Sequence, residues 1–336
     1  MNDNVFREES RAVLSRRTAI AALSAPLWPG VARAADFPAR PLKIVVPFTP
    51  GGVGDIFARL AGDVMAKDLG QPVVVENKAG ANQMLAASAV THAAPDGLTL
   101  YQATSTAILN PLLFKKLAYD PQALKPLWIG LETPLIFIVN PKVPASNLAE
   151  FVAYARSNRG KLNYSSIGAG NVLHLAMEKL KASAGIEITH VPYAGRSGDA
   201  INAVVAGDVQ IMATIVGQAV PLVQAGRLRA LAVTSAQRLA AMPDVATVTE
   251  SGFADLAVAS WYGLYVHAAT PDDMAQRLRE AADKALGDAH FRQTFISTGA
   301  VIPPVRSGAE VRRYVEDNTR YWADLIREQK LTLSME

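Results

Sequence analysis

The stretch that decides the fold is KIVVPFTPGGVGDIFARL, residues Lys43–Leu60. A β-branched run, typical of a buried strand, meets a turn with glycine at three of the four positions Gly51–Gly54. The residues after the turn place apolar side chains at helical spacing. Glycines let the backbone approach a ligand closely, and free N–H groups at a helix start favour a negative group. This strand–turn–helix unit therefore predicts an anion-binding loop.

Two residues exclude a nucleotide from this loop. A phosphate-binding P-loop carries Lys after its last glycine, whereas Gly54 is followed by Asp55. A dinucleotide fingerprint needs a third glycine at the position of Phe57. Asp55 is expected to cap the helix and to use one or two of its N–H donors. What remains suits a single carboxylate, and a tight turn without a ligand is the alternative.

Strand-like and helix-like segments alternate along the rest of the chain, which predicts an α/β protein with mostly parallel sheets. The predicted helices include 55–67, 81–93, 172–184 and 198–205, and one that Ser146 or Asn147 caps. A second polar glycine turn, YSSIGAGNVLH, again lies at the end of a strand. Two such turns predict two lobes that face a cleft, with chain crossings near Asn140 and Ala259.

The amino-acid composition and motifs argue against several classes of function. The 336 residues are 50% hydrophobic and 19% charged, with a net charge of +3 and no long basic run, so no nucleic-acid partner is expected. The chain has no cysteine, and its five histidines lack metal-ligand spacing, so neither a metal nor a cofactor is expected. GRSGD lacks the last glycine of a nucleophile elbow. The tryptophans expected in the core or the cleft wall are Trp128, Trp261 and Trp322.

The N-terminus has the order of an export signal. Arg16 and Arg17 precede a short apolar stretch, residues 18–31, and Ala32-Arg33-Ala34 fits a signal-peptidase site. We therefore expect residues 1–34 to be a signal peptide, cleaved after Ala34, through either the general or the twin-arginine route. The mature chain is expected to be soluble and periplasmic.

From Phe37 onward the chain resembles a known family along its whole mature length. The motifs, in family order, are FPARPLKIVVPFTPGGVGD, LGQPVVVENKAGA, AAPDGLTL, NPLLFKKLAYDP, GKLNYSSIGAGNVLHLAMEKLKASAG, ITHVPYAG, GRLRALAVTSAQR and PDVATVTESGF. They resemble the Bug-type solute receptors, the substrate-binding proteins of tripartite tricarboxylate transporters. The resemblance implies a two-lobed, flytrap-like periplasmic-binding-protein fold that closes on a small organic carboxylate and delivers it to a membrane permease. Residues 35–140 and 259–336 would form a discontinuous first lobe, and residues 141–258 the second.

The resemblance also implies ligand-binding positions. On the first lobe they are Phe48, Thr49, Pro50, Gly51, Gly52, Gly54, Asp55, Asn82, Gln83, Thr104 and Ser105. On the second lobe they are Ser165, Ser166, Gly168, Gly170, Asn171, His174, Tyr193 and Gly195. For His174 and Tyr193, packing beside the cleft is the alternative. Arg196 is expected either to pair with a second ligand carboxylate or, as we favour, to be solvated on the rim.

Asn82-Gln83-Met84 stands where the family usually has glycines and small residues, and these bulkier side chains are expected to narrow or re-aim the pocket. A monomeric receptor without catalytic residues is the leading hypothesis. An exported hydrolase that uses Thr49, Ser105, Ser166 or His174 is one alternative, and a sensor that presents its closed form to a signalling protein is another. Dicarboxylates, tricarboxylates, amino-acid dicarboxylates and aromatic acids all stay open as ligands.

Overall fold

A computed structural model describes residues 37–193 and 197–328, so the predicted signal peptide lies outside the described residues. The elements up to the middle of the chain are β1 (Leu42–Val46), α1 (Val53–Leu69), β2 (Val73–Asn77), η2 (Ala81–Gln83), α2 (Met84–Thr91), β3 (Thr99–Thr104), α3 (Thr106–Leu113), η3 (Pro121–Ala123), β4 (Leu124–Val139) and α4 (Leu148–Ser157). They are followed by β5 (Asn163–Ser166), α5 (Val172–Ala184), β6 (Thr189–Pro192), α6 (Ser197–Ala206), β7 (Ile211–Ile215), α7 (Val216–Gln224), β8 (Arg229–Val233), η4 (Ala254–Leu256), β9 (Ala259–His267), α8 (Asp272–Asp283), η5 (Lys284–Gly287), α9 (Ala289–Ile296) and α10 (Gly308–Glu328).

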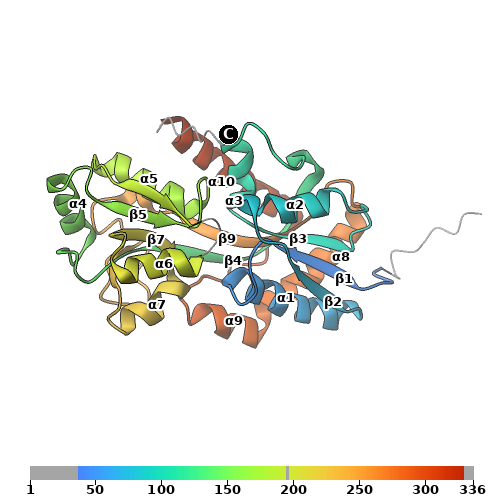
Figure 1. Cartoon of the computed structure of the whole chain (residues 1–336). Coiled ribbons are helices and arrows are strands. Elements are labelled where there is room, and N and C mark those ends of the chain that lie inside the picture. Colours follow the sequence, from blue (N-terminus) through green and yellow to red (C-terminus); the bar gives the residue numbers. More distant parts are fainter. Residues whose placement is uncertain (1–36, 194–196, 329–336) are drawn as a thin grey trace, which may run out of the picture. The chain divides into compact units, whose positions relative to one another are not determined.

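The strands form two sheets that share the long strand β4 (Figure 1). The first sheet has the order β2-β1-β3-β9-β4, and the second joins β4 to β7, β5 and β6, with β8 also paired to β4. β4 pairs with β9 as far as Pro134 and with β7 and β8 from about Leu135 onward. The two-lobed α/β class predicted from the sequence is therefore confirmed.

The sheets are mixed, whereas the sequence predicted mostly parallel ones. β1 is parallel to β2 and β3, and β5 is parallel to β6 and β7. All pairs that contain β4 or β9 are antiparallel. The reason is that β4 leaves the first sheet while β9 returns to it, so these two neighbours run in opposite directions.

Helices cover both faces of each sheet (Figure 1). Alternate residues of β1 show how: Leu42, Ile44 and Val46 belong to one apolar cluster with residues of α1, α8 and α9, whereas Val45 packs with residues of α2 and α3. Trp128, Trp261 and Trp322 are each at most 1% exposed, which confirms them as core residues.

Local signals explain where several helices begin and end. Asn147 caps α4, as one of the two predicted candidates, by accepting a hydrogen bond from the Glu150 N–H. Asn171 caps α5, and Gly185 ends it in the left-handed conformation, so the predicted range 172–184 is confirmed. The predicted helix 81–93 is wrong at its start, because residues 81–83 have positive φ and regular helix begins at Met84. No helix within the described part of the chain is long and apolar enough to cross a membrane.

Candidate functional site

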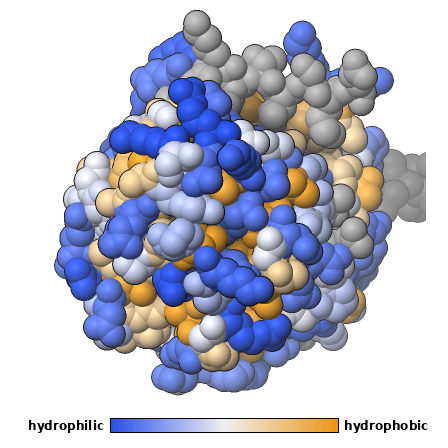
Figure 2. Space-filling view, turned by 60° about the vertical axis from the view of Figure 1, so that its left-hand side comes forward, coloured by the Kyte–Doolittle hydropathy of each residue, from blue (hydrophilic) through white to orange (hydrophobic). Residues whose placement is uncertain are grey.

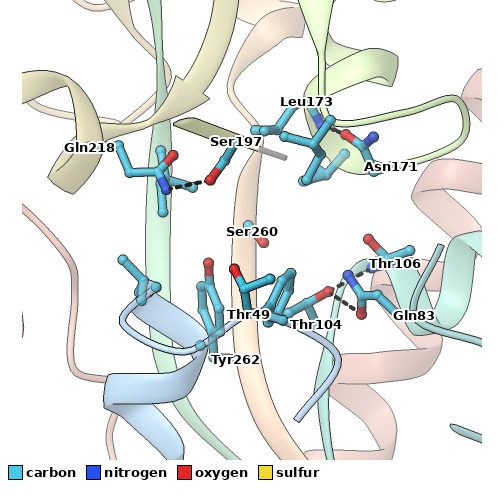
Figure 3. A pocket seen from close by; sticks show the side chains of 17 residues that line it. Thr49, Gln83, Thr104, Thr106, Asn171, Leu173, Ser197, Gln218, Ser260 and Tyr262 are labelled. Atoms are coloured by element: carbon cyan, nitrogen blue, oxygen red, sulfur yellow. Dashed lines mark hydrogen bonds between the residues drawn. The ribbon is translucent and has the colours of Figure 1, made fainter. Parts of the chain in front are cut away.

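A cavity of about 70 Å³ lies where loops from the two sheets face each other (Figure 3). About 10–15 Å³ holds one water molecule, so the space suits a small organic molecule and not a nucleotide. Its lining residues are Phe48, Thr49, Gly52, Val53, Gly54, Gln83, Thr104, Thr106, Ile167, Asn171, Val172, Leu173, Ser197, Ile215, Gln218, Ser260 and Tyr262. None of these described lining residues is charged.

Five helices present their first residues to this cavity. The lining contains the N-terminal positions of α1, α3, α5, α6 and α7. The first-turn N–H groups of a helix have no partner within the helix, and the helix dipole places partial positive charge at this end. The cavity therefore offers a positive potential without a lysine or arginine among its described lining residues, which suits a small anion.

The glycine loop before α1 forms one wall because no larger residue fits there. A Cβ atom on Gly54 would lie 2.4 Å from the Phe48 ring and 2.9 Å from Gln102 Oε1. Gly52 is the N-cap of α1 and has no side chain to occupy the first-turn donors. The backbone N–H groups at the start of α1 thus stay available beside the cavity.

Asp55 does not cap the helix as the sequence predicted, and its predicted contact with a ligand stays untested. The sequence predicted a helix cap and a ligand contact, but the N-cap is Gly52 and the Asp55 carboxylate lies outside the cavity lining. It accepts hydrogen bonds from the Gly51 N–H at 3.0 Å, from Arg59 at 2.9 and 3.0 Å and from Asn77 at 2.9 Å. Burial raises the pKa of Asp55, but these hydrogen bonds outweigh it and the pKa is lowered on balance. Asp55 therefore fixes the loop from behind as a carboxylate.

Across the same wall, Gln83 is held by hydroxyl groups. Its Oε1 accepts hydrogen bonds from Thr104 Oγ1 at 3.0 Å and from the Tyr101 hydroxyl at 3.3 Å. Tyr262 completes this wall, and its hydroxyl oxygen points into the cavity (Figure 3). Burial raises the pKa of Tyr262, so its hydroxyl stays protonated and able to donate to an anion.

The loop between β5 and α5 forms part of the opposite wall. Asn171 Oδ1 caps α5 by accepting from the N–H groups of Leu173 and His174, and its amide donates to the Gly168 carbonyl. Ser166 Oγ donates to the same carbonyl at 2.9 Å and therefore accepts from His190 Nε2 at 2.6 Å. Hydrogen bonds within this lobe thus set the shape of the loop before any ligand arrives.

Two more polar side chains stand on the second lobe. Gln218 Nε2 donates to Ser197 Oγ at 3.2 Å, and Gln218 Oε1 accepts from Thr214 Oγ1 at 3.2 Å. Ser260, from β9, lies between the two walls (Figure 3).

The structure brings some of the predicted site residues together in the cavity lining and leaves others outside it. Those in the lining are Phe48, Thr49, Gly52, Gly54, Gln83, Thr104 and Asn171. Those outside it are Pro50, Gly51, Asp55, Asn82, Ser105, Ser165, Ser166, Gly168, Gly170, His174 and Tyr193. Gly195 and Arg196 lie outside the described residues. Contact of any of these residues with a ligand stays a prediction.

Sequence reasoning missed several lining residues. They are Val53, Thr106, Ile167, Val172, Leu173, Ser197, Ile215, Gln218, Ser260 and Tyr262. Most of them stand at or next to the start of a helix that follows a strand, and that position was the available signal. Ser260 and Tyr262 lie within β9, where nothing in the local pattern indicates a cavity.

Comparison with known proteins decides the family. Residues 57–331 match the model of the tripartite tricarboxylate transporter family receptor, TctC. The chain belongs to this family. The TctC-family chain is 29% identical over 326 residues to the protein BugT of Bordetella pertussis, an alignment that covers 94% of this chain and 96% of BugT.

Solved structures support the same assignment. MatC from Rhodopseudomonas palustris, a structure with bound malate, superposes with a TM-score of 0.79 at 34% identity, covering 86% of this chain and all of MatC. The R. palustris protein Rpa4515, solved with adipate, gives a TM-score of 0.82 at 29% identity, covering 88% of this chain and 99% of that one. This receptor is therefore a Bug-type, two-lobed member of the family.

Proposed function

We propose that this chain is an exported periplasmic receptor that binds a small organic carboxylate in the cavity between its lobes. The observation that carries the proposal is the cavity itself, where five helix N-termini, hydroxyls and amides meet without a charged side chain among the described lining residues. The malate and adipate in the two related structures support the same ligand class.

Backbone and hydroxyl donors can hold a carboxylate in this setting. Each favourable helix N-terminus stabilises a nearby anion by about 0.3–1 kcal/mol, and hydrogen bonds to a charged acceptor contribute roughly 1.5–3 kcal/mol. Ordered waters that bridge the remaining distances are nearly as favourable as direct contacts. Such a site needs no salt bridge.

The two lobes close around the ligand in this proposal. We assign residues 35–140 and 259–336 to the first lobe and residues 141–258 to the second, and β4 and β9 connect them. Since the lining comes from both lobes, a bound ligand contacts both and selects the closed form. The closed monomer then delivers the carboxylate to a permease of the tripartite tricarboxylate type.

The hydrolase alternative has less support. Of the four residues that could serve it, only Thr49 lines the cavity. Ser166 does bond to His190, but Ser166 is fully buried, its hydroxyl donates to the Gly168 carbonyl, and neither residue lines the cavity. A receptor that presents its closed form to a sensor protein is compatible with the same cavity.

A thermal-shift panel on residues 35–336 tests the proposal. Ligands at 100 times their Kd add about 2.7 kcal/mol of stability, which gives a clear shift of Tm. We expect a shift with one class of carboxylate and none with sugars or nucleotides. Thr49→Asp places a carboxylate in the cavity and should abolish the shift, whereas the matched change Ser297→Asp on the exposed surface should preserve it. If no carboxylate stabilises the protein after it is refolded free of ligand, the proposal is wrong.

A further inference from the structure

The turn that carries Gln83 has an unusual backbone. Ala81, Asn82 and Gln83 have φ values of 45°, 49° and 72°, and Gly80 before them has a φ of 128°. Residues with a Cβ atom seldom adopt this left-handed region, and three in succession persist only where the surrounding structure enforces them. Strain of this kind gathers at functional sites.

Helix α3 enforces this turn through one buried residue. Asn82 Nδ2 donates to Asn110 Oδ1 at 2.7 Å, and Asn110 Nδ2 donates back to the Asn82 carbonyl at 2.9 Å. Asn110 is only 1% exposed. Because this pair fixes Asn82 from two sides, the next residue, Gln83, has its side chain in the cavity wall.

The hydrogen bonds of the wall determine which end of the Gln83 amide faces the ligand. Thr104 Oγ1 accepts from the Thr106 N–H at 3.3 Å, so its own proton is free to donate to Gln83 Oε1. The Tyr101 hydroxyl donates to the same oxygen. Among the residues that the structure describes, none accepts a hydrogen bond from Gln83 Nε2. The end of Gln83 left for a ligand is therefore its N–H donor.

The wall on the second lobe also presents a hydrogen-bond donor to the cavity. Thr214 donates to Gln218 Oε1, and Gln218 Nε2 donates to Ser197 Oγ. No acceptor for the Ser197 proton lies among the described residues, so this proton is left for an acceptor in the cavity. Gln83 stands on the first lobe and Ser197 on the second, with the cavity between them (Figure 3).

We propose that Gln83 determines the specificity of this site: its Nε2 amide donates to an acceptor oxygen at one end of the ligand, while Ser197 meets the other end. The inference rests on the proposed function as a carboxylate receptor. A ligand that presents an ammonium group to Gln83 brings two donors together and is rejected, because a buried unpaired polar group is costly. A ligand amide offers only a neutral carbonyl oxygen as acceptor, so it binds less tightly than a carboxylate, which forms a charge-assisted hydrogen bond with the Gln83 N–H.

Gln83→Glu reverses the polarity of this contact without changing its shape. The glutamate still accepts from Tyr101 and Thr104, but the atom that faces the cavity becomes a charged acceptor. None of the described lining residues carries a positive charge to offset it. The variant should reject a second ligand carboxylate and accept an amide in its place.

The test is isothermal titration of succinate and adipate, each against its monoamide. For whichever of the two diacids wild type binds more tightly, we expect its affinity to be at least tenfold higher than that for the corresponding monoamide. We expect Gln83→Glu to bind the monoamide more tightly than the diacid. Gln83→Met, which offers neither donor nor acceptor, should bring the ratio near one, and it serves as the second readout if the glutamate variant does not fold. The matched control Gln293→Glu adds the same charge on the exposed surface of α9 and should keep the wild-type ratio.

The outcomes separate the two proposals. If wild type binds a diacid and neither Gln83→Glu nor Gln83→Met changes the ratio, the specificity assignment is overturned while the carboxylate receptor stands. If wild type, freed of co-purified ligand, binds no carboxylate in the thermal-shift panel, the receptor proposal itself is overturned.

Discussion

Two histidines hold the loop between β5 and α5 from beneath. Their rings lie 4.4 Å apart, and His190 also stacks on Tyr164 at 4.8 Å. His190 donates to Ser166, and His174 Nδ1 accepts from the Gly170 N–H at 3.3 Å. The role of His174 requires a neutral imidazole, since a protonated Nδ1 could not accept, whereas His190 can donate to Ser166 in either protonation state.

This pair makes stability depend on pH in a defined direction. The pKa of each histidine is lowered from 6.5 to about 4, and burial is the main cause. His190 also lowers the pKa of His174, Lys181 lowers the pKa of both histidines, and Glu178 opposes these effects. Because the folded pKa lies below the unfolded one, the unfolded chain binds more protons between these values. Stability should therefore be complete above pH 6.5 and fall as the pH approaches 4, by roughly 2–3 kcal/mol per histidine at most.

Urea unfolding at several pH values measures this dependence. His190→Gln keeps an N–H donor for Ser166 and should lose part of the decrease in the free energy of unfolding between pH 6.5 and about 4. His290→Gln, an exposed change on α9, leaves the pair intact and should follow wild type. An unchanged slope in His190→Gln would show that the histidine pair does not cause it.

The strained turn gives a second prediction at single residues. Ala81 is exposed and has a φ of 45°, so Ala81→Gly removes backbone strain without removing a contact. The greater freedom of glycine in the unfolded chain offsets part of the gain, and we expect about 0.5–1 kcal/mol of net stabilisation. Ala153→Gly, at an exposed position in the interior of α4, should destabilise by a similar amount. If Ala81→Gly destabilised the protein as much as the control variant does, the backbone at Ala81 would not be strained.

At the scale of elements, the pairing of β4 with β9 requires a glycine. Register shifts interrupt β4 on both sides of Ile129, which pairs with Gly263. A Cβ atom on Gly263 would lie 2.2 Å from the Trp128 carbonyl oxygen and 2.8 Å from Ile129. The close contact is with backbone, so a side-chain rotation cannot relieve it.

Gly263→Ala should therefore destabilise the protein by about 1–3 kcal/mol, in the range of overpacked cores. Thermal unfolding of the ligand-free protein measures the effect. The matched control is Gly287→Ala, where an added Cβ meets nothing within 4 Å, and its change should stay within about 0.5 kcal/mol. A Gly263→Ala protein as stable as the control would mean that β4 and β9 can separate locally at little cost.

The sequence predicted elements well where a local signal marks both ends. Helix α5 is such a case, because Asn171 begins it and Gly185 ends it. The start of α2 was predicted wrongly, because the left-handed turn before it is held by Asn110, a residue far along the chain. The antiparallel pairs of β4 were missed for a similar reason: strand direction follows from the path of the chain between two sheets, which no short stretch contains.

At the scale of the whole molecule, the site was predicted on one side of the cavity better than on the other. The loop near Gly54 carries its own signature, a strand followed by glycines and a helix. Ser197 and Gln218 have no such signature and become part of the site because α6 and α7 begin at the same end of the second sheet (Figure 1). Figure 2 shows one face of the molecule, on which polar and apolar side chains are interspersed.

Closure of the lobes predicts that contacts on the two walls are coupled. Thr49→Val removes a hydroxyl from the first wall, and Ser197→Ala removes one from the second. Each should weaken binding of the carboxylate found in the panel by about 1–2 kcal/mol.

If the ligand selects the closed form, a variant that lacks the hydroxyl contact on one wall closes less, and the second substitution then has a smaller effect on binding. Titration of both single variants and the double variant should therefore give a combined loss below the sum of the two. A sum that agrees within about 0.5 kcal/mol would instead indicate independent walls and a cavity already formed without ligand.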